Sequence, residues 1–416
     1  MESINNLRGT YDILPGEIEY WHYIESKAQN LFEQANYSEI RTPILEFQDL
    51  FERGVGQGTD IVNKEMYSFQ DKGKRYITLR PEGTAGIARS FIQHKVYASN
   101  KIQKFWYKGP MFRYERPQLG RQRQFTQLGI EVIGSKNSRA DAEVISIAFE
   151  LLNRLELRDF NLEINSIGQI DNRKQYETNL VQYLNKYYND LDEDTQHKLK
   201  INPLRILDTK DIKTQEILEN APQINDFLDD NSRNHFITLC KYLDTMSIPY
   251  SINYNLVRGL DYYNDTAFEF KTKELGSQDT ICGGGRYDKL IKILGGPEVG
   301  AIGWAIGMER LLAIIKNKIQ ISKKEIDFYI ISENTEETKL ESMLIFQQLI
   351  NKKHKVILNL DDEKLQKQLK KGSDYSAKFC IIVKKDENEQ KQIIQKNMQT
   401  GEQKLIKKEN ISYSIN

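Results

Sequence analysis

The sequence predicts an α/β protein with two domains. The larger is expected to be an α+β domain, built on an antiparallel sheet and interrupted by a helical insertion, and the smaller a C-terminal α/β domain. Three observations predict this organisation: a strand–loop–strand pattern at 107–134, helical spacing with little strand signal at 170–247, and alternating strands and helices from residue 327. We expect the domains to span 1–325, with the insertion at 170–247, and 326–416.

The elements of the larger domain follow from apolar spacing and from proline and glycine positions. Apolar residues three and four apart predict helices, and β-rich runs predict strands, with proline at a strand end. The insertion is rich in Asn, Asp, Lys and Tyr, so a solvated connector is the alternative to packed helices. In order, we predict a helix over 18–35, a strand over 37–43, a strand over 76–80, a helix reaching residue 96, hairpin strands over 112–115 and 124–134, a helix over 140–155, strands over 160–165, 251–257 and 266–271, and a strand running into a helix over 295–315.

The smaller domain is predicted from strict alternation of strand and helix signals. Its many lysines are expected to form a solvated surface. The predicted strands are 328–331, 355–360, 378–383 and one after Gly401, and the predicted helices are 335–351 and 362–371.

Composition limits the function classes. The formal net charge is zero, so any RNA contact would depend on local basic patches. The three cysteines, Cys240, Cys282 and Cys380, lie far apart, which argues against a structural zinc site and a disulfide scaffold. No apolar run reaches about 18 residues, so no membrane span is expected. The N-terminus resembles neither a signal peptide nor a transit peptide.

The hairpin at 107–134 carries one candidate site. Side chains alternate faces along a strand, so Phe125, Gln127, Gly129 and Glu131 share one face, and the opposite face is apolar. An aromatic ring beside polar groups is suited to the floor of a binding site. The alternative is an amphipathic hairpin whose polar face contacts only solvent. The connecting loop is basic through Arg116, Arg121 and Arg123.

A second candidate lies where the strand 76–80 meets the next helix. The carboxylate of Glu82 can bind a cationic group there, and Thr84 can add a hydroxyl. The alternative is that Thr84 acts only as a helix N-cap.

Two further motifs are Arg258-Gly-Leu-Asp-Tyr-Tyr263 and Cys282-Gly-Gly-Gly-Arg286-Tyr287-Asp288. The glycine run lacks the Lys and Ser or Thr of a P-loop, and we expect a tight turn that lets the backbone approach a ligand. Arg310 lies near the start of a helix, where the dipole favours anions. A polyphosphate site or a structural ion pair would tolerate a cation at that position.

These motifs resemble those of class II aminoacyl-tRNA synthetases. Phe112-Arg113-x-Glu115 with Arg123-x-Phe125 resembles motif 2, and Gly307-x-Glu309-Arg310 resembles motif 3. The helix and strand that precede Pro43 resemble motif 1, which forms the dimer interface in that family. The runs at 79–84, 116–131, 258–263 and 282–288 resemble the histidyl-tRNA synthetases in particular.

The resemblance covers nearly the whole chain. Residues from 327 resemble the anticodon-binding domain of the same family, and the insertion occupies the place of one that contacts the acceptor arm of tRNA. The resemblance is weak in the insertion and after about residue 405. Thr126 departs from the family, which usually has His there; its side chain should point away from the floor, so we expect little consequence.

The resemblance implies that histidine and ATP form histidyl-adenylate and diphosphate, and that the histidyl group then passes to tRNA(His) with release of AMP. Such activation depends mainly on positioning and charge stabilisation. It implies catalytic roles for Arg113, Arg258 and Gln127, with the two arginines on opposite sides of the α-phosphate. Mg²⁺ is expected with ATP rather than at a protein metal motif. The residues implied in ATP binding are Arg113, Glu115, Arg121, Arg123, Phe125, Arg258 and Arg310.

For histidine, the resemblance implies that Glu131 and Tyr263 meet the two imidazole nitrogens, because one partner can accept and the other can donate. Tyr262 and Tyr287 would form the pocket walls. The amino and carboxylate ends would be held by Glu82, Thr84 and Gln127.

The resemblance also implies partners and a compartment. Arg116 and Gln118 are expected at the acceptor end of tRNA, and a homodimer is expected through the segment around Pro43. The expected location is a bacterial cytoplasm or a plastid stroma, without a membrane.

Three other functions compete with this one. A catalytically inactive paralogue that regulates histidine biosynthesis typically lacks the motif at 258–263 and the C-terminal domain, and this chain keeps both. A class II synthetase for proline, threonine or glycine would not carry the pair of motifs at 258 and 283. An RNA-binding protein without catalysis would not need Arg113, Arg258 and Arg310 together.

Overall fold

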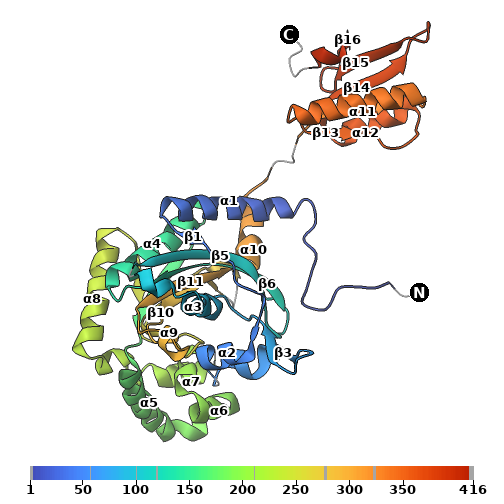
Figure 1. The fold of residues 1–416 in the computed structure, drawn as a ribbon. Helices are drawn as coiled ribbons and strands as arrows, with labels where there is room; N and C mark the ends of the chain where they lie inside the picture. Colours follow the sequence, from blue (N-terminus) through green and yellow to red (C-terminus); the bar gives the residue numbers. More distant parts are fainter. Residues whose placement is uncertain are drawn as a thin grey trace. The chain divides into compact units, whose positions relative to one another are not determined.

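The computed structural model describes residues 3–56, 58–99, 101–118, 120–209, 211–275, 279–321 and 325–411. The chain forms two compact units, residues 1–321 and 322–416, each with its own hydrophobic core (Figure 1). The boundary lies four residues before the one expected at 325/326.

The larger unit is built on an eight-stranded sheet. Its inner strands are antiparallel, and each edge strand pairs in parallel with its neighbour. The predicted hairpin forms its middle, with Phe105 opposite Glu131 and Tyr107 opposite Gly129. In spatial order the strands are β1 (Ser38–Glu39), β5 (Gln103–Phe112), β6 (Gln124–Ile133), β11 (Ala301–Gly307), β10 (Thr280–Arg286), β9 (Asn264–Lys271), β7 (Asn161–Ser166) and β8 (Ser251–Ile252).

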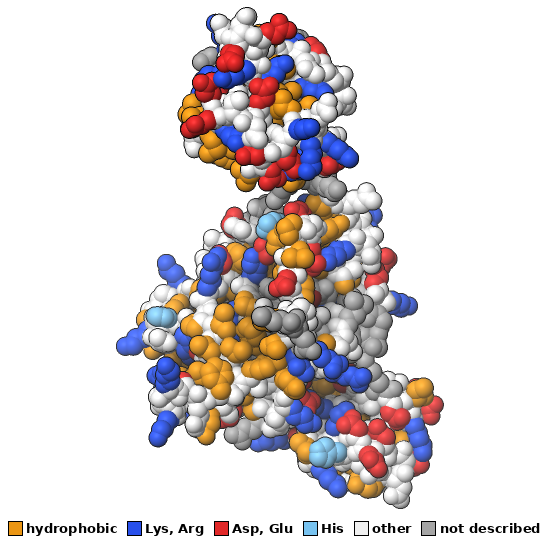
Figure 2. Space-filling model, turned by 90° about the vertical axis from the view of Figure 1, so that its right-hand side faces the viewer, with side chains coloured by type: hydrophobic (Ala, Val, Ile, Leu, Met, Phe, Trp, Pro, Cys, Tyr) orange, Lys and Arg blue, Asp and Glu red, His pale blue; other side chains and the backbone are white. Residues whose placement is uncertain are grey.

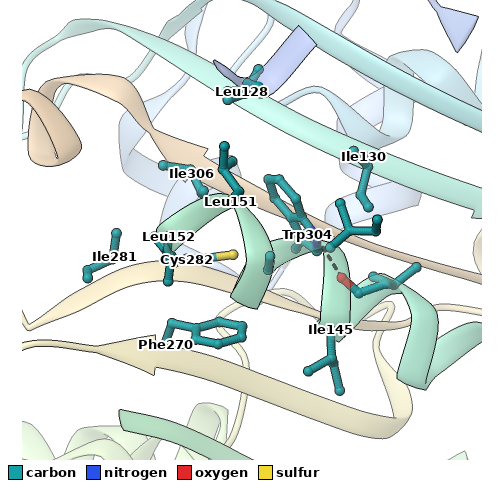
Figure 3. Close-up of a cluster of buried hydrophobic side chains, with 14 of the residues drawn as sticks. Leu128, Ile130, Ile145, Leu151, Leu152, Phe270, Ile281, Cys282, Trp304 and Ile306 are labelled. Carbon is teal, nitrogen blue, oxygen red and sulfur yellow. Dashed lines mark hydrogen bonds between the residues drawn. The ribbon is translucent and has the colours of Figure 1, made fainter. Parts of the chain in front are cut away.

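Helices cover the apolar face of this sheet. Leu128, Ile130 and Trp304 project from β6 and β11 into a core of buried hydrophobic side chains (Figure 3). The indole nitrogen of Trp304 donates to the carbonyl of Val144 at 2.9 Å, so this core is tied to its covering helix by a buried hydrogen bond. The covering helices are α1 (Ile18–Gln34), α4 (Ser138–Arg154), α8 (Asp230–Thr245) and α10 (Met308–Lys318).

The opposite face of the sheet carries the polar side chains and is only partly covered. A small antiparallel sheet packs beside it, and the neighbouring helices contribute to a second buried cluster. Its strands are β2 (Leu45–Phe47), β4 (Tyr76–Leu79) and β3 (Tyr67–Gln70). The neighbouring helices are α2 (Gln48–Val55), the π-helix η1 (Ile61–Glu65), α3 (Thr84–Gln93), η2 (Val96–Ser99) and α9 (Leu290–Ile293).

The insertion is helical, as predicted, and it packs through a buried set of apolar side chains, including Tyr176, Leu180, Leu184, Ile206 and Ile224, so it is not a solvated connector. Its last helix, α8, packs against α4 and the main sheet, because Phe236, Leu239 and Leu243 belong to the core behind that sheet. The other elements are α5 (Ile170–Leu184), η3 (Asn185–Asp190), α6 (Glu193–Ile201), η4 (Pro203–Asp208), α7 (Ile212–Leu218) and η5 (Ile224–Phe227).

The smaller unit is a five-stranded sheet with two helices. Parallel pairing of β13, β12 and β14 follows from the helices between them. Its elements are β12 (Ile326–Ser332), α11 (Glu336–Asn351), β13 (Val356–Leu358), α12 (Leu365–Asp374), β14 (Ala377–Lys385), β15 (Lys391–Asn397), β16 (Gln403–Ile406) and η7 (Lys408–Asn410).

Several predicted elements were wrong in extent or type. The first hairpin strand is β5, which ends at Phe112, so Arg113 and Glu115 lie in the loop. Of the strand predicted at 251–257 only two residues pair, and the glycine run expected to be a turn is the buried strand β10. Strand β15 was missed because its two adjacent isoleucines lie between Gln, Lys and Asn residues and show no period-two alternation.

One face of the larger unit carries a broad patch of hydrophobic side chains (Figure 2). Within the described residues, the small sheet exposes four large hydrophobic side chains, Leu45, Phe47, Phe69 and Tyr76, and the exposed Pro43 lies two residues before its strand β2. None of the helices described is long and apolar enough to cross a membrane.

Candidate active site

A cavity of about 190 Å³ lies on the polar face of the main sheet. Segments distant in the sequence supply its walls, because β6, β10 and β11 are neighbours in the sheet. The lining includes most of the predicted site residues: Glu82, Thr84, Arg113, Glu115, Arg121, Phe125, Gln127, Glu131, Arg258, Tyr262, Tyr263, Tyr287 and Arg310.

Glu131 is a buried acid at the closed end of the cavity. Thr84 donates its hydroxyl to one carboxylate oxygen at 2.7 Å, and Tyr287 donates to the other at 2.5 Å. Burial raises the pKa of Glu131 to about 8, against the lowering effect of these two hydrogen bonds. The carboxyl group is therefore fixed in orientation and can exchange a proton with a ligand near neutral pH.

Glu82 supplies the helix cap that had been considered for Thr84. Its carboxylate accepts the backbone N–H groups of Thr84 and Ala85, at 2.6 and 2.8 Å, at the N-terminus of α3. The Thr84 hydroxyl is thus directed to Glu131, and the alternative that it only caps the helix is wrong. Burial raises the pKa of Glu82, although those N–H groups oppose the effect.

Three tyrosines form an aromatic wall around this end. The ring of Tyr262 lies 4.6 Å from that of Tyr263 and 5.7 Å from that of Tyr287, measured between centroids. Burial raises the pKa of all three hydroxyls, so they remain protonated and can donate hydrogen bonds.

The open end is cationic. The Arg113 guanidinium lies over the Phe125 ring, 5.3 Å from its centroid, and donates to the carbonyl of Pro81 at 2.8 Å. Glu115 pairs with Arg121 at 3.1 Å and faces Arg113 at 3.8 Å. The loop thus presents cations and a carboxylate beside the aromatic face of Phe125, at the beginning of β6.

Arg258 enters the cavity from the opposite side. Its guanidinium pairs with Glu269 on β9 and lies against the backbone of Gly283, where an added Cβ would lie 2.5 Å from a guanidinium nitrogen. Burial is the largest influence on the pKa of Arg258 and lowers it, but the Glu269 carboxylate together with Tyr263 and Tyr262 outweighs burial and leaves the pKa raised. Its Nε and the side-chain oxygen of Gln127 are buried without a hydrogen-bond partner in the described residues, as expected of groups that await a ligand.

Arg310 and Glu309 join the site from the first turn of α10. Arg310 donates to the carbonyls of Gly120 and Thr280, at 3.3 and 2.9 Å, and so links the hairpin loop to β10. Glu309 accepts the backbone N–H of Thr126 at 2.8 Å, and burial raises its pKa to about 7. The helix start thus contacts both the hairpin loop, at Gly120, and the beginning of β6, at Thr126.

Comparison with known proteins decides the family. A model of histidyl-tRNA synthetase matches residues 9–311, and a model of an anticodon binding domain matches residues 327–415. The chain belongs to the histidyl-tRNA synthetase family.

Relatives and solved structures agree with this assignment. A chloroplastic histidine–tRNA ligase of Gracilaria tenuistipitata var. liui is 55% identical, with 91% of this chain and 89% of that protein aligned. A histidine–tRNA ligase of Cyanothece sp. is 50% identical over 98% of this chain and 94% of that protein. The crystal structure of apo histidyl-tRNA synthetase from S. aureus superposes with a TM-score of 0.80 at 37% identity, covering 97% of each chain.

A structure described as an ATP phosphoribosyltransferase regulatory subunit/histidyl-tRNA synthetase from Bacillus halodurans has a TM-score of 0.68. At 20% identity over 93% of this chain and all of that one, it shows only that the fold is shared.

Three predicted residues of this family member lie outside the cavity lining. Arg123 was predicted to reach ATP phosphates, but its guanidinium stacks on the Tyr114 ring, 3.8 Å from the centroid, and its Nε donates to the Glu115 carbonyl. We correct that prediction. The aliphatic part of the Arg123 side chain packs against Gly9, and its guanidinium points away from the cavity. Of Arg121 and Arg123, only Arg121 lines the cavity. Arg116 and Gln118 are exposed on the loop.

Tyr107, Glu309 and Glu269 are among the lining or supporting residues that the sequence did not predict. Tyr107 lines the cavity from β5 and could have been found from its pairing opposite Gly129. Glu309 was noted only as part of a motif, without a contact. Glu269 is a charged residue within an otherwise apolar strand, and the sequence carries no further signal for its role. Only the fold brings it into contact with its partner Arg258.

The donor set does not favour a resident metal ion. Among the described residues there is no group of three His, Cys, Asp or Glu side chains that could hold one. The carboxylates nearest the arginines, Glu115 and Glu269, are already paired with cations.

Proposed function

We propose that the protein attaches L-histidine to tRNA(His) through a histidyl-adenylate, consuming ATP and releasing AMP and diphosphate. One observation carries this proposal: a single cavity joins a buried acid surrounded by tyrosines to a cluster of four arginines. An amino acid with a hydrogen-bonding ring fits the first part, and a polyphosphate fits the second.

At the closed end, Glu131 would bind one imidazole nitrogen and Tyr263 the other. Glu131 is held by Thr84 and Tyr287, so its orientation is set before the ligand enters. The free oxygen of Gln127 and the carboxylate of Glu82 suit the α-ammonium group. A ligand without ring nitrogens would leave buried groups unpaired, which disfavours it strongly.

At the open end, the adenine would stack on Phe125 and its amino group would meet Glu115. Arg113 and Arg258 approach from opposite walls, so the α-phosphate between them would be stabilised as the histidine carboxylate attacks. Arg121 and Arg310 would meet the outer phosphates. Mg²⁺ would arrive with ATP and neutralise part of the charge on the leaving diphosphate.

The remaining expectations concern partners. The exposed Arg116 and Gln118 are available to the acceptor end of tRNA, and residues 327–415 to its anticodon. We expect a homodimer, because Pro43 adjoins a small sheet that exposes large hydrophobic side chains. We expect the protein in a bacterial cytoplasm or a plastid stroma.

The test is amino-acid-dependent exchange of pyrophosphate into ATP, run with histidine, proline, threonine and glycine. Exchange with histidine alone is the expected result and would establish activation and specificity together. Exchange with another of these amino acids would overturn the assignment of the pocket. Binding of histidine without exchange would support the regulatory paralogue instead.

A further inference from the structure

The loop that carries Arg258 is held by a residue of the insertion. Arg205, on η4, donates through one guanidinium nitrogen to the carbonyl of Gly259 at 2.8 Å. This carbonyl belongs to the residue directly after Arg258. The backbone position of Arg258 is therefore connected to the insertion by one charge-assisted hydrogen bond.

The Arg205 guanidinium also makes a second contact. Its other terminal nitrogen pairs with Asp60 at 2.6 Å, just before the π-helix η1. The last residue of η1, Glu65, accepts the backbone N–H of Tyr114 at 2.7 Å. Arg205 thus contacts the Arg258 loop directly, and it contacts the segment that holds the Arg113 loop.

The main body of the unit holds this loop on both sides of Gly259. Before it, Asn165 of β7 donates to the carbonyls of Tyr254 and Leu256, at 3.2 and 3.0 Å. Asp261 donates its backbone N–H to the carbonyl of Val55 at 3.1 Å and packs on Gly56, where no Cβ would fit. Arg173 of α5 reaches the Asp261 carbonyl only at 3.5 Å. A cavity of about 30 Å³ remains between the loop and the insertion, so packing alone does not fix their distance.

We propose that Arg205 is a positioning residue through which the helical insertion places Arg258 for adenylate formation. It touches neither substrate site and acts through the Gly259 carbonyl. The kinetic consequence rests on the proposed function, whereas the effect on the loop does not. Because small displacements of a catalytic group are costly, loss of this contact should affect turnover more than histidine binding.

The first experiment follows backbone amide hydrogen exchange by mass spectrometry in the full chain. In Arg205→Gln, peptides covering 256–263 should exchange roughly ten-fold faster, since a local restraint is removed. The matched control is Lys213→Gln, which breaks the exposed ion pair to Asp190 within the insertion, 2.9 Å in length, and should leave 256–263 unchanged. Unchanged exchange of this loop in a folded Arg205→Gln variant would overturn the proposal.

The second experiment measures histidine-dependent pyrophosphate exchange per titrated active site. Arg205→Gln should lower kcat about 10–100-fold and change the KM for histidine less than about three-fold. In an Arg258→Ala background the same substitution should have no further effect. An equal loss in that background would show that Arg205 acts independently of Arg258 and would overturn the proposal.

Two outcomes need separate treatment. If the wild-type protein shows no exchange, the proposed function fails, and faster amide exchange at 256–263 in Arg205→Gln still supports the positioning role. If Arg205→Gln does not fold, Asp60→Asn removes one arm of the contact and should give a smaller change in the same direction. No change in either measurement with Asp60→Asn would then overturn the proposal.

Discussion

The buried Glu131 is suited to ligand recognition, but its ionisation lowers the stability of the folded protein. Its pKa in the folded state is about 8, above the ordinary value of 4.5, so the folded protein binds this proton more tightly than the unfolded chain. The contribution of Glu131 to stability is therefore fully favourable below pH 4.5 and is lost as the pH rises toward 8.

We predict that Glu131→Gln raises the free energy of unfolding at pH 8, by an amount on the order of a few kcal/mol, and much less at pH 5. The same variant should use histidine poorly, because the ring loses its ionisable partner. Urea unfolding at pH 5 and pH 8 measures the change in stability, and the KM for histidine measures the change in substrate use. A stability difference that does not depend on pH would contradict the raised pKa.

Gly283 gives a second test at this scale. A methyl group there would meet the end of the Arg258 side chain, which can move, and not the backbone. We predict that Gly283→Ala lowers adenylate formation about 10–100-fold through displacement of that cation, with little change in thermal stability. Gly58→Ala is the control, because its nearest neighbour, Asp261, lies at an ordinary 3.8 Å. A fully active Gly283→Ala enzyme would contradict this account of Arg258.

At the scale of elements, a buried polar cluster joins α4 to the sheet. Asp141, in the first turn of α4, pairs with Arg286 of β10 and accepts from Thr266 and His235, the latter on α8. Both members of the main pair are almost completely buried. Arg286 also pairs with Asp288 at 3.0 Å, which orders the chain on both sides of Tyr287. The cluster thus positions a pocket residue from behind the sheet.

We predict that Asp141→Asn lowers the free energy of unfolding by about 3–5 kcal/mol, because the buried Arg286 loses one of its two carboxylate partners and keeps only Asp288 as a counter-charge. The control is Glu150→Gln, which breaks the half-exposed pair with Arg154 in the same helix and should cost less than about 1 kcal/mol. Chemical denaturation of both variants measures the two losses in the free energy of unfolding. Equal effects would mean that the buried pair contributes no more than an exposed one.

At the scale of the whole molecule, the two units have separate cores, and residues 1–321 contain the entire cavity lining. We predict that a chain ending at residue 321 folds and keeps histidine-dependent pyrophosphate exchange within a few-fold, while aminoacylation of tRNA(His) falls at least about 100-fold. Loss of exchange in a folded truncated chain would contradict the independence of the units.

Local patterns in the sequence determined much of this architecture. Period-two alternation placed Phe125, Gln127 and Glu131 on one face of β6 and the apolar residues on the other, because side-chain direction in a strand is fixed by position. Helical spacing identified α1, α4 and the helical nature of the insertion. The extents of β8 and β15 were not predictable, since strand length depends on which neighbour is available for pairing.

Only the tertiary structure decided which side chains meet. Thr84, Tyr287 and Glu131 are far apart in the sequence, and sheet order brings them into hydrogen-bond contact. The same holds for Arg258 with Glu269, and for Arg205 with the Gly259 carbonyl. Arg121 and Arg123 have the same local pattern, yet packing against Gly9 and Tyr114 turns one away. Sequence alone determined the chemistry available, whereas contacts between distant segments determined its geometry.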